Sequence, residues 1–313
     1  MSKMKIVFMG TPDFAVPSLE ELVKEFDVKA VITQPDRPKG RGKSLAMSPV
    51  KEVALKHNIE VYQPEKIRKD QETIDKIKAI EPDFIVVVAF GQILPKEVLD
   101  IPRYGCINLH GSLLPRFRGA APINYSVMAG DKVSGNTTML MDVGLDTGDM
   151  LLKNTVEITE NMTAGELYEI LKETGAPLLI ETLKKLANNE LTPEKQDDDL
   201  SCYAHMLNRD MANIDWNKSA QEVHNFIRGL NPFPIAYSYH EDKMMKILES
   251  EVLNEKSTKT PGTILKVDKE GMRISTKNGI LLAKKIQFPN KKAMKVSEYI
   301  KGNSIEENIV LHK

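Results

Sequence analysis

Short apolar runs that alternate with amphipathic stretches occupy the first half of this 313-residue chain and constrain its fold most. The runs are short and rich in β-branched or aromatic residues, as buried parallel strands are. They are Ile6–Met9, Val28–Thr33 and Phe84–Ala89. Between them lie three segments with helical spacing, Pro17–Glu25, Pro49–His57 and Glu72–Ala79. This repetition of strand and helix predicts right-handed crossovers and therefore an α/β fold with a doubly wound, mostly parallel sheet.

The pattern changes after about Leu207. One helix-like segment, Ser219–Gly229, is followed by five short strand-like pieces with turn signals such as Asp268–Gly271 between them. The pieces are Ile235–His240, Met244–Glu251, Thr263–Val267, Met272–Thr276 and Ile280–Phe288. Several short strands punctuated by turns predict a small β-barrel.

A long helix and a polar segment stand between the two patterns. Met162–Asn188 has the periodicity of one helix, which Pro177 can bend. Asn188–Ser201 is polar and carries three consecutive aspartates, so its composition is that of a linker. A chain of this length fits about two domains, in agreement with the two patterns.

Charge is distributed unevenly along the chain. The overall net charge is −1, which by itself argues against a nucleic-acid binder. However, Met1–Met206 carries a net charge of −6, Leu207–Lys313 one of +5, and Ser257–Lys301 within it one of +8. A basic module on an acidic body indicates a polyanion as partner. A lysine-rich surface that faces solvent and binds no partner would give the same net charges.

Several classes of protein are disfavoured. No apolar run approaches the ~18 residues of a membrane span, and the N-terminus lacks the layout of a signal peptide. Cys106 and Cys202 alone imply no disulfide framework, which fits the cytoplasm. Gly10–Asp13 is not a dinucleotide-binding Gly-x-Gly-x-x-Gly, and no phosphate-binding Gly-x-x-x-x-Gly-Lys-Ser/Thr loop occurs, so nicotinamide and ATP are not indicated.

Two candidate catalytic residues lie at the end of a buried-looking run, Tyr104–Leu109. Asn108 and His110 are two positions apart, so both side chains point to one face of an extended strand. Asp146 follows in a second, glycine-flanked loop. An amide, an imidazole and a carboxylate without a nucleophilic Ser or Cys suit acyl transfer to an external nucleophile. A core histidine and a turn-forming aspartate are the alternatives; a metal site is disfavoured because no second histidine stands at ligand spacing.

These residues resemble the 10-formyltetrahydrofolate-dependent formyltransferases. Asn108-x-His110, Ser112-Leu-Leu-Pro115 and Asp146 mark the superfamily, and the fuller match is to the methionyl-tRNA formyltransferase family. Five further stretches carry that match: Lys5–Phe14, Gln34–Gly42, Arg116–Pro122, Leu230–Pro234 and Pro261–Ile264. One departure is that Asn136 and Thr138 stand where the family usually has apolar residues.

The resemblance implies a mechanism and a folate site. Asn108 would bind the oxyanion and hold the formyl group, His110 would donate to the same oxygen and relay a proton, and Asp146 would accept the proton. The formyl donor would be 10-formyltetrahydrofolate, with no metal. The residues expected to bind it are Phe90, Gly91, Gln92, Ile93, Leu94, Ser112, Leu113, Leu114, Pro115 and Asp142. The resemblance also raises the expectation of a cis peptide before Pro115.

The resemblance further implies initiator methionyl-tRNA as the acceptor. In the family the loop that carries Arg41 reaches the acceptor stem, and the C-terminal domain is OB-like. The residues expected to bind tRNA are Arg37, Lys39, Arg41, Lys43, Lys284, Lys285, Lys291 and Lys292. We expect a catalytic formyltransferase domain over residues 1–188, a linker over 189–206 and a tRNA-binding domain over 207–313, acting as a cytoplasmic monomer.

Two other functions remain open at this point. A formyltransferase for a small amine, such as a nucleotide-linked sugar or glycinamide ribonucleotide, would share the three catalytic residues but would need neither the basic loop nor the basic barrel. A non-catalytic RNA-binding protein on a formyltransferase scaffold would bind tRNA without folate-dependent turnover. The presence of Asn108, His110 and Asp146 together argues against a non-catalytic RNA-binding protein.

Overall fold

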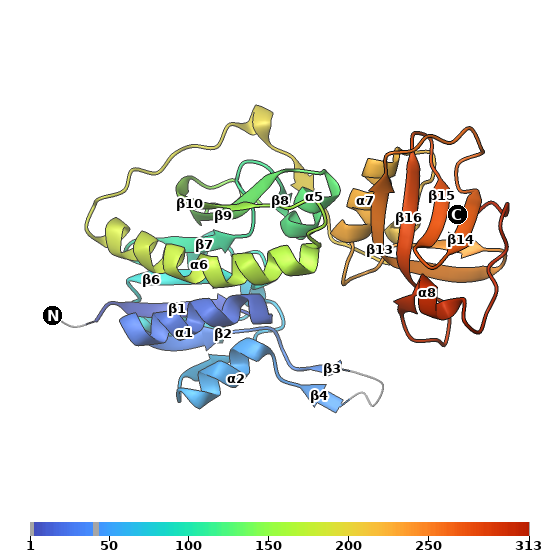
Figure 1. Cartoon of the computed structure of the whole chain (residues 1–313). Helices are drawn as coiled ribbons and strands as arrows, with labels where there is room; N and C mark the ends of the chain where they lie inside the picture. Colours follow the sequence, from blue (N-terminus) through green and yellow to red (C-terminus); the bar gives the residue numbers. More distant parts are fainter. Residues whose placement is uncertain (1–2, 40–43, 313) are drawn as a thin grey trace. The chain divides into compact units, whose positions relative to one another are not determined.

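The computed structural model describes residues 3–39 and 44–312 and divides into two compact units (Figure 1). The N-terminal unit comprises Met1–Gly119, Gly135–Val156 and Tyr168–Tyr203. The C-terminal unit comprises Ala120–Ser134, Glu157–Leu167 and Ala204–Lys313. Both units are thus assembled from three separate segments. In the described part of the chain, no helix is long and apolar enough to cross a membrane.

A seven-stranded sheet forms the centre of the N-terminal unit, in the order β10-β9-β7-β6-β1-β2-β5. Its strands are β1 (Lys5–Gly10), β2 (Asp27–Ile32), β5 (Glu60–Tyr62), β6 (Phe84–Val88), β7 (Cys106–His110), β9 (Val133–Leu140) and β10 (Met150–Glu157). From β5 to β7 every pairing is parallel, and β9 runs antiparallel to β7. The predicted doubly wound, mostly parallel sheet is therefore confirmed.

Helices cover the sheet as the alternating pattern predicts. They are α1 (Val16–Glu25), α2 (Pro49–Lys56), α3 (Gln71–Ile80), α4 (Lys96–Leu99) and α6 (Ala164–Ala187). Figure 1 shows α1 and α6 over one face, while Val7 and Met9 of β1 face α3 through Ile74 and Ile77 in a common core. Ser48 caps α2 by accepting a hydrogen bond from the Lys51 amide, as its place before Pro49 predicts.

Asn136 of β9 contacts the backbone of α6 near Pro177. Pro177 lies inside that helix and has no N–H to donate. The Asn136 amide donates to the Leu171 carbonyl at 3.0 Å, and Asn154 of β10 donates to the Thr174 carbonyl at 2.8 Å. Of the two residues that depart from the family pattern, Asn136 is thus matched by a carbonyl of α6, whereas Thr138 contacts the Leu152 backbone of β10 and the Thr182 hydroxyl of α6.

An antiparallel sheet that curls into a half-barrel forms the centre of the C-terminal unit, in the order β12-β13-β16-β15-β14, with β17 paired to β16. Its strands are β12 (Tyr237–His240), β13 (Lys243–Leu253), β14 (Ile264–Asp268), β15 (Gly271–Ser275), β16 (Ile280–Gln287) and β17 (Met294–Lys295). Its helices are α5 (Pro122–Met128), α7 (Ala220–Gly229) and α8 (Val296–Tyr299). The predicted OB-like barrel strands are present, whereas α5 had no signal in the sequence analysis.

Helix α7 begins at a capping box formed by Ser219 and Glu222 and buries the polar side chains of His224, Asn225 and Arg228. His224 contacts the Ser250 hydroxyl through Nδ1 and the Glu160 carbonyl through Nε2. Arg228 donates to the Met162 carbonyl at 2.9 Å. Burial lowers the pKa of His224, because the low-dielectric interior disfavours the charged ring. Side chains of α7 thus hold the segment 157–167 by hydrogen bonds to the backbone carbonyls of Glu160 and Met162.

Candidate active site

Asn108 and His110 lie on β7, at its carboxyl end. Their side chains share one face because they are two residues apart, and they are only 8% and 6% exposed. Asn108 is paired with Val87 of β6 on one side and with Met139 of β9 on the other. In parallel α/β sheets, ligands bind beyond the carboxyl ends of the strands, so both residues stand where such a fold places its site.

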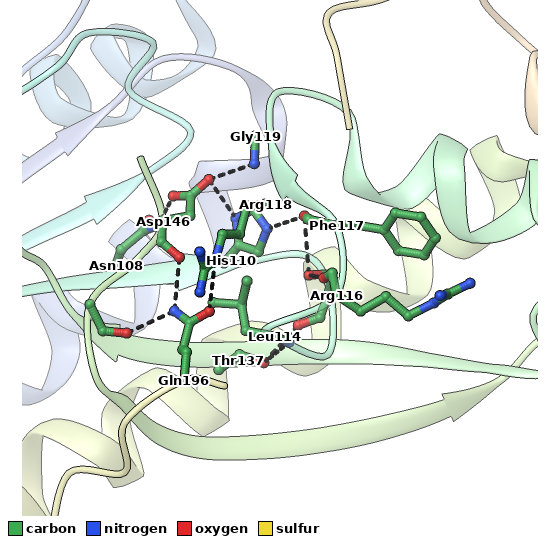
Figure 2. A network of polar contacts seen from close by, with 12 residues as sticks. Asn108, His110, Leu114, Arg116, Phe117, Arg118, Gly119, Thr137, Asp146 and Gln196 are labelled. Carbon is green, nitrogen blue, oxygen red and sulfur yellow. Dashed lines mark hydrogen bonds and ion pairs between the residues drawn. The ribbon is translucent and has the colours of Figure 1, made fainter. Parts of the chain in front are cut away.

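Asp146 reaches the same place from the loop between β9 and β10 (Figure 2). Its Oδ2 lies 3.8 Å from His110 Nδ1 and accepts a hydrogen bond from the Gly119 amide at 2.8 Å. Its Oδ1 accepts from Asn108 Nδ2 at 3.5 Å. The three side chains that the sequence singled out therefore converge within hydrogen-bond or one-water reach.

The loop that carries Asp146 has an unusual backbone. Asp146 has a φ of 54°, in the left-handed region that costs a non-glycine residue free energy. Gly148 is required two residues later, because a Cβ there would lie 1.8 Å from the Leu140 carbonyl oxygen. Asp142 accepts hydrogen bonds from the Gly144 amide and the Thr147 hydroxyl at 2.9 and 2.6 Å, which closes a tight turn. The carboxylate of Asp142 therefore stabilises the loop itself.

The partner of His110 Nε2 determines which ring nitrogen is free. Nε2 lies 2.9 Å from the Phe117 carbonyl, and because a carbonyl can only accept, Nε2 must donate. In the neutral ring Nδ1 is then an unprotonated base that faces Asp146. In the protonated ring Nδ1 becomes a second donor. His110 can therefore hold or release a proton at Nδ1 while Phe117 keeps its orientation fixed.

The segment Ser112–Pro115 follows β7 directly. The Thr137 hydroxyl of β9 donates to the Ser112 carbonyl at 2.7 Å and accepts from the Leu114 amide at 3.1 Å. The Leu114–Pro115 peptide is cis, which confirms that expectation. Leu114 is buried beside Met139 and Met150, and Leu113 is half-buried. This segment therefore forms a rigid, partly apolar edge beside Asn108 and His110.

A second segment, Phe90–Leu94, follows β6. Phe90 and Leu94 are buried in the core, whereas Ile93 is 68% exposed. Gly91 has a φ of 82°, which only glycine adopts without strain. The Gln92 side chain is already engaged, since it accepts from the Ile67 amide and donates to the Pro64 carbonyl. Within this segment, Ile93 and the backbone are thus better placed than Gln92 to contact a ligand.

Arg37 and Lys39 belong to β3 (Arg37–Lys39), which forms a hairpin with β4 (Ser44–Ala46). The Arg37 side chain is exposed. Arg41 and Lys43, also expected to bind tRNA, lie outside the described residues. Of the four residues of this loop that are expected to bind tRNA, Arg37 and Lys39 therefore lie on a strand, β3, that pairs antiparallel with β4.

The four barrel lysines have different surroundings. Lys284 and Lys285 of β16 form ion pairs with Glu251 and Glu249 of β13, at 3.1 and 3.0 Å. Lys291 donates to the Asn303 side chain and lies over the Tyr299 ring, whereas Lys292 is exposed. Two of the lysines are therefore partly neutralised by carboxylates on the neighbouring strand.

Among the described residues, two hollows of the N-terminal unit lie at opposite edges of its sheet. The larger, of about 670 Å³, is lined by charged residues such as Lys78, Asp83 and Arg103, which precede β6 and β7. It therefore lies at the amino ends of these strands, at the opposite edge of the sheet from Asn108 and His110. The other, of about 570 Å³, is lined by Thr11, Gln34 and Phe90 among others. Since these follow β1, β2 and β6, this hollow opens at the same edge of the sheet as Asn108.

Comparison with known proteins supports the chemistry. The family model described as formyl transferase matches residues 4–183, and that of the formyl transferase C-terminal domain matches residues 206–304. Methionyl-tRNA formyltransferase of Clostridium perfringens (strain 13) is 64% identical over 308 residues, covering 98% of this chain and all of the relative. That of Clostridium novyi is 62% identical over the same share of this chain. The chain belongs to the methionyl-tRNA formyltransferase family.

Solved structures resemble this member of the family in fold. A sugar 3N-formyl transferase, WlaRD, has a TM-score of 0.69 at 23% identity, covering 93% of this chain and all of the other. HypX from Aquifex aeolicus, solved with tetrahydrofolic acid, has a TM-score of 0.62 at 17% identity, covering 96% of this chain and 47% of the other. At these identities the likeness concerns the fold alone.

Several residues of the polar network were not found by the sequence analysis. Gly119 donates its amide to Asp146, and Thr137 fixes the Ser112–Leu114 backbone. Gln196, from the polar segment taken as a linker, donates to the carbonyls of the Asp146 loop, and Arg118 donates to Gln196 (Figure 2). Backbone amides leave no signal in a sequence, and Gln196 is separated from Asp146 by fifty positions.

Proposed function

We propose that this protein transfers the formyl group of 10-formyltetrahydrofolate to the α-amino group of methionyl initiator tRNA, for translation initiation. The observation that carries the chemistry is the approach of Asn108, His110 and Asp146 at the carboxyl end of β7. The full-length likeness to methionyl-tRNA formyltransferases supports the acceptor. We further propose that the protein acts in the cytoplasm, because its acceptor is a component of translation, and that it acts as a monomer.

The reaction forms one C–N bond and breaks another. The neutral amine attacks the formyl carbon and gives a tetrahedral adduct with a negatively charged oxygen. The adduct then expels N10 of the folate, while one proton passes from the attacking nitrogen to N10. The products are formyl-methionyl-tRNA and tetrahydrofolate, and the site must supply hydrogen-bond donors and a proton relay.

Each polar side chain suits one of these tasks. Asn108 is an uncharged donor, so its Nδ2 stabilises the oxyanion without exchanging a proton. His110 donates to the same oxygen when Nδ1 is protonated, and its fixed Nε2 leaves that nitrogen free. Asp146 accepts the proton of the attacking amine, directly or through water. The Gly119 amide on its Oδ2 keeps this carboxylate aimed at the other two residues.

The surroundings of the site fit a folate. A pterin ring needs an apolar slot and a few backbone hydrogen bonds. Ile93 and the backbone of Gly91 supply one wall, and the buried Leu114 with the Ser112–Pro115 backbone supplies another. Val143 and Leu145, which are 66% and 52% exposed at the tip of the Asp146 loop, offer further apolar surface.

The deciding experiment is incubation with 10-formyltetrahydrofolate and methionyl initiator tRNA. We expect formyl-methionyl-tRNA and tetrahydrofolate in equal amounts, with elongator methionyl-tRNA as a poor acceptor. A nucleotide-linked amino sugar and glycinamide ribonucleotide serve as competing amines. Preferred formylation of a small amine would replace the proposal with the small-molecule alternative. Binding of tRNA without turnover would favour a non-catalytic RNA-binding protein.

A further inference from the structure

The side chain of Gln196 contacts two carbonyls of the loop that carries Asp146. Its Nε2 donates to the Asp146 carbonyl and to the Gly148 carbonyl, both at 2.8 Å (Figure 2). The first of these carbonyls belongs to Asp146 itself, whose backbone has a left-handed φ of 54°. One amide group therefore holds the strained part of the loop at two points.

The orientation of the Gln196 side-chain amide is fixed by the hydrogen bond that its oxygen accepts. Its Oε1 accepts a hydrogen bond from Arg118 Nε at 3.0 Å. A guanidinium can only donate and a carbonyl can only accept, so a flipped amide would oppose like groups at both ends. Arg118 is 3% exposed, and its Nη2 pairs with the exposed Asp198 at 2.7 Å. Charge-assisted hydrogen bonds of this kind hold the amide firmly.

The segment around Gln196 is itself attached to the N-terminal unit. Glu194 exchanges two backbone hydrogen bonds with Met150, at 2.8 and 2.9 Å. The Arg118 amide donates to the Cys202 carbonyl at 2.8 Å. Gln196 therefore extends from a segment anchored on both sides, and can oppose movement of the Asp146 loop instead of following it.

The Asp146 loop has reason to need such support. Val143 and Leu145 at its tip are largely exposed, so little apolar packing holds it. Its internal turn is closed by Asp142, four residues before Asp146. A left-handed aspartate persists only where its surroundings enforce that conformation. The carboxylate would lose its alignment with Asn108 and His110 if this backbone relaxed.

We propose that Gln196 is a positioning residue for formyl transfer, which keeps Asp146 aligned with Asn108 and His110 by binding the carbonyls of Asp146 and Gly148. Arg118 supports it by fixing the direction of its amide. The proposal rests on the catalytic role of Asp146 in the proposed function. The segment that composition marks as a linker is, in this respect, part of the scaffold of the active site.

Gln196→Met tests the role, because methionine keeps the length of the side chain and removes both donors. We expect kcat for formyl transfer to fall about 10- to 100-fold, as a small misplacement of a catalytic group does. The KM for tRNA should change less than about twofold, because the proposed role of Gln196 is to hold the Asp146 loop and not to bind a substrate. Gln71→Met, in an exposed glutamine of α3, is the matched control and should leave kcat unchanged. Wild-type kcat in folded Gln196→Met would overturn the proposal.

Gln196→Glu is the second variant and guards against a failure to fold. It retains the partner of Arg118 but sets a carboxylate oxygen against two carbonyls. We expect a loss of kcat at least as large as that of Gln196→Met. A folded Gln196→Glu variant with wild-type kcat would also overturn the proposal.

A double-mutant cycle with Asp146→Ala distinguishes positioning from a general structural effect. If Gln196 acts through Asp146, Gln196→Met should lower kcat by less than about twofold in the Asp146→Ala background. A loss that multiplies in the double variant would contradict the proposal. If Asp146→Ala alone retained wild-type kcat, the proposed function of that residue would fail instead.

Amide hydrogen exchange provides a readout independent of activity. Residues 142–148 should exchange faster in Gln196→Met than in the wild type, while Gln71→Met should leave their exchange unchanged. Unchanged exchange in Gln196→Met would show that the loop holds its conformation without Gln196, and would overturn the positioning role even if the catalytic role of Asp146 stood.

Discussion

Polar side chains have different surroundings in two regions of the molecule. One is the edge of the N-terminal unit that carries the proposed catalytic residues Asn108 and His110 (the catalytic edge), and the other is β16 of the C-terminal unit (the basic strand). Asn108 and His110 are buried and bound to fixed partners, so each has one available direction for its chemistry. Lys284 and Lys285 lie towards solvent opposite glutamates of the next strand. A buried polar group acts through its geometry, whereas a surface charge acts through the local sum of charges, which its neighbours can cancel.

The largest expected effect concerns the catalytic edge. Replacing Asn108, His110 or Asp146 with alanine should lower kcat for formyl transfer by about 10²- to 10⁴-fold, because in the proposed function each acts on charge that develops in the transition state. Single-turnover rates with saturating tRNA measure this. His57→Ala, in an exposed histidine at the end of α2, is the control and should change the rate little. A His110→Ala variant as active as that control would remove the distinction between the two regions.

The next effect tests whether burial alone makes a polar residue important. Asn136→Ala removes the amide that donates to the Leu171 carbonyl of α6, and should lower the free energy of unfolding by about 1–3 kcal/mol. Urea denaturation measures the change. The exposed Asn161→Ala should stay within about 0.5 kcal/mol of the wild type. Equal stability of the two variants would show that α6 does not depend on Asn136.

A smaller effect is expected on the basic strand. Replacing Lys284 and Lys285 with methionine should weaken tRNA binding a few-fold and flatten the slope of log affinity against log salt by about 0.7–0.9 for each lost phosphate contact. Fluorescence titration at several salt concentrations measures both quantities.

The paired glutamates supply the reverse experiment. Glu249→Gln with Glu251→Gln should strengthen tRNA binding, because it frees both lysines from their ion pairs. If neither the lysine nor the glutamate variants altered affinity or salt slope, these lysines would be solvated surface, and a small-molecule amine would become the better acceptor.

The smallest expected effect concerns the interior of the C-terminal unit. Burial lowers the pKa of His224 below its ordinary value of 6.5, so the unfolded chain binds a proton more readily than the folded one. Stability should therefore fall as the pH drops through 6.5 towards the lower pKa of the folded state. His224→Gln should lessen this fall, and the difference between the two urea midpoints measured from pH 7.5 to 5 isolates it. Parallel pH profiles would show that His224 does not titrate differently in the two states.

Much of the fold and part of the site could be predicted from local sequence. The spacing of Asn108 and His110 fixes their common face once β7 is recognised, because a strand alternates its side chains. The position of Asp146 depends instead on a left-handed backbone and on the Gly119 amide, neither of which has a sequence signature. Lys285 stands opposite Glu249 because of the register of β13 and β16, so counting charges along the chain could not reveal this pairing.

The discontinuity of the two units has a consequence for synthesis on the ribosome. Helix α5 packs against α7 in the C-terminal unit, yet its last residue precedes the first residue of α7 by about ninety positions. At about 5–20 residues per second, the ribosome needs roughly 5 to 20 seconds to deliver that partner. Throughout this interval α7 is not yet available to pack against the apolar side of α5, which carries Ile123 and Val127. A nascent chain that stalls after β10 and before α7 has all the strands of the α/β sheet but lacks the partner of α5. Such a chain should therefore attract chaperones that bind exposed apolar helices.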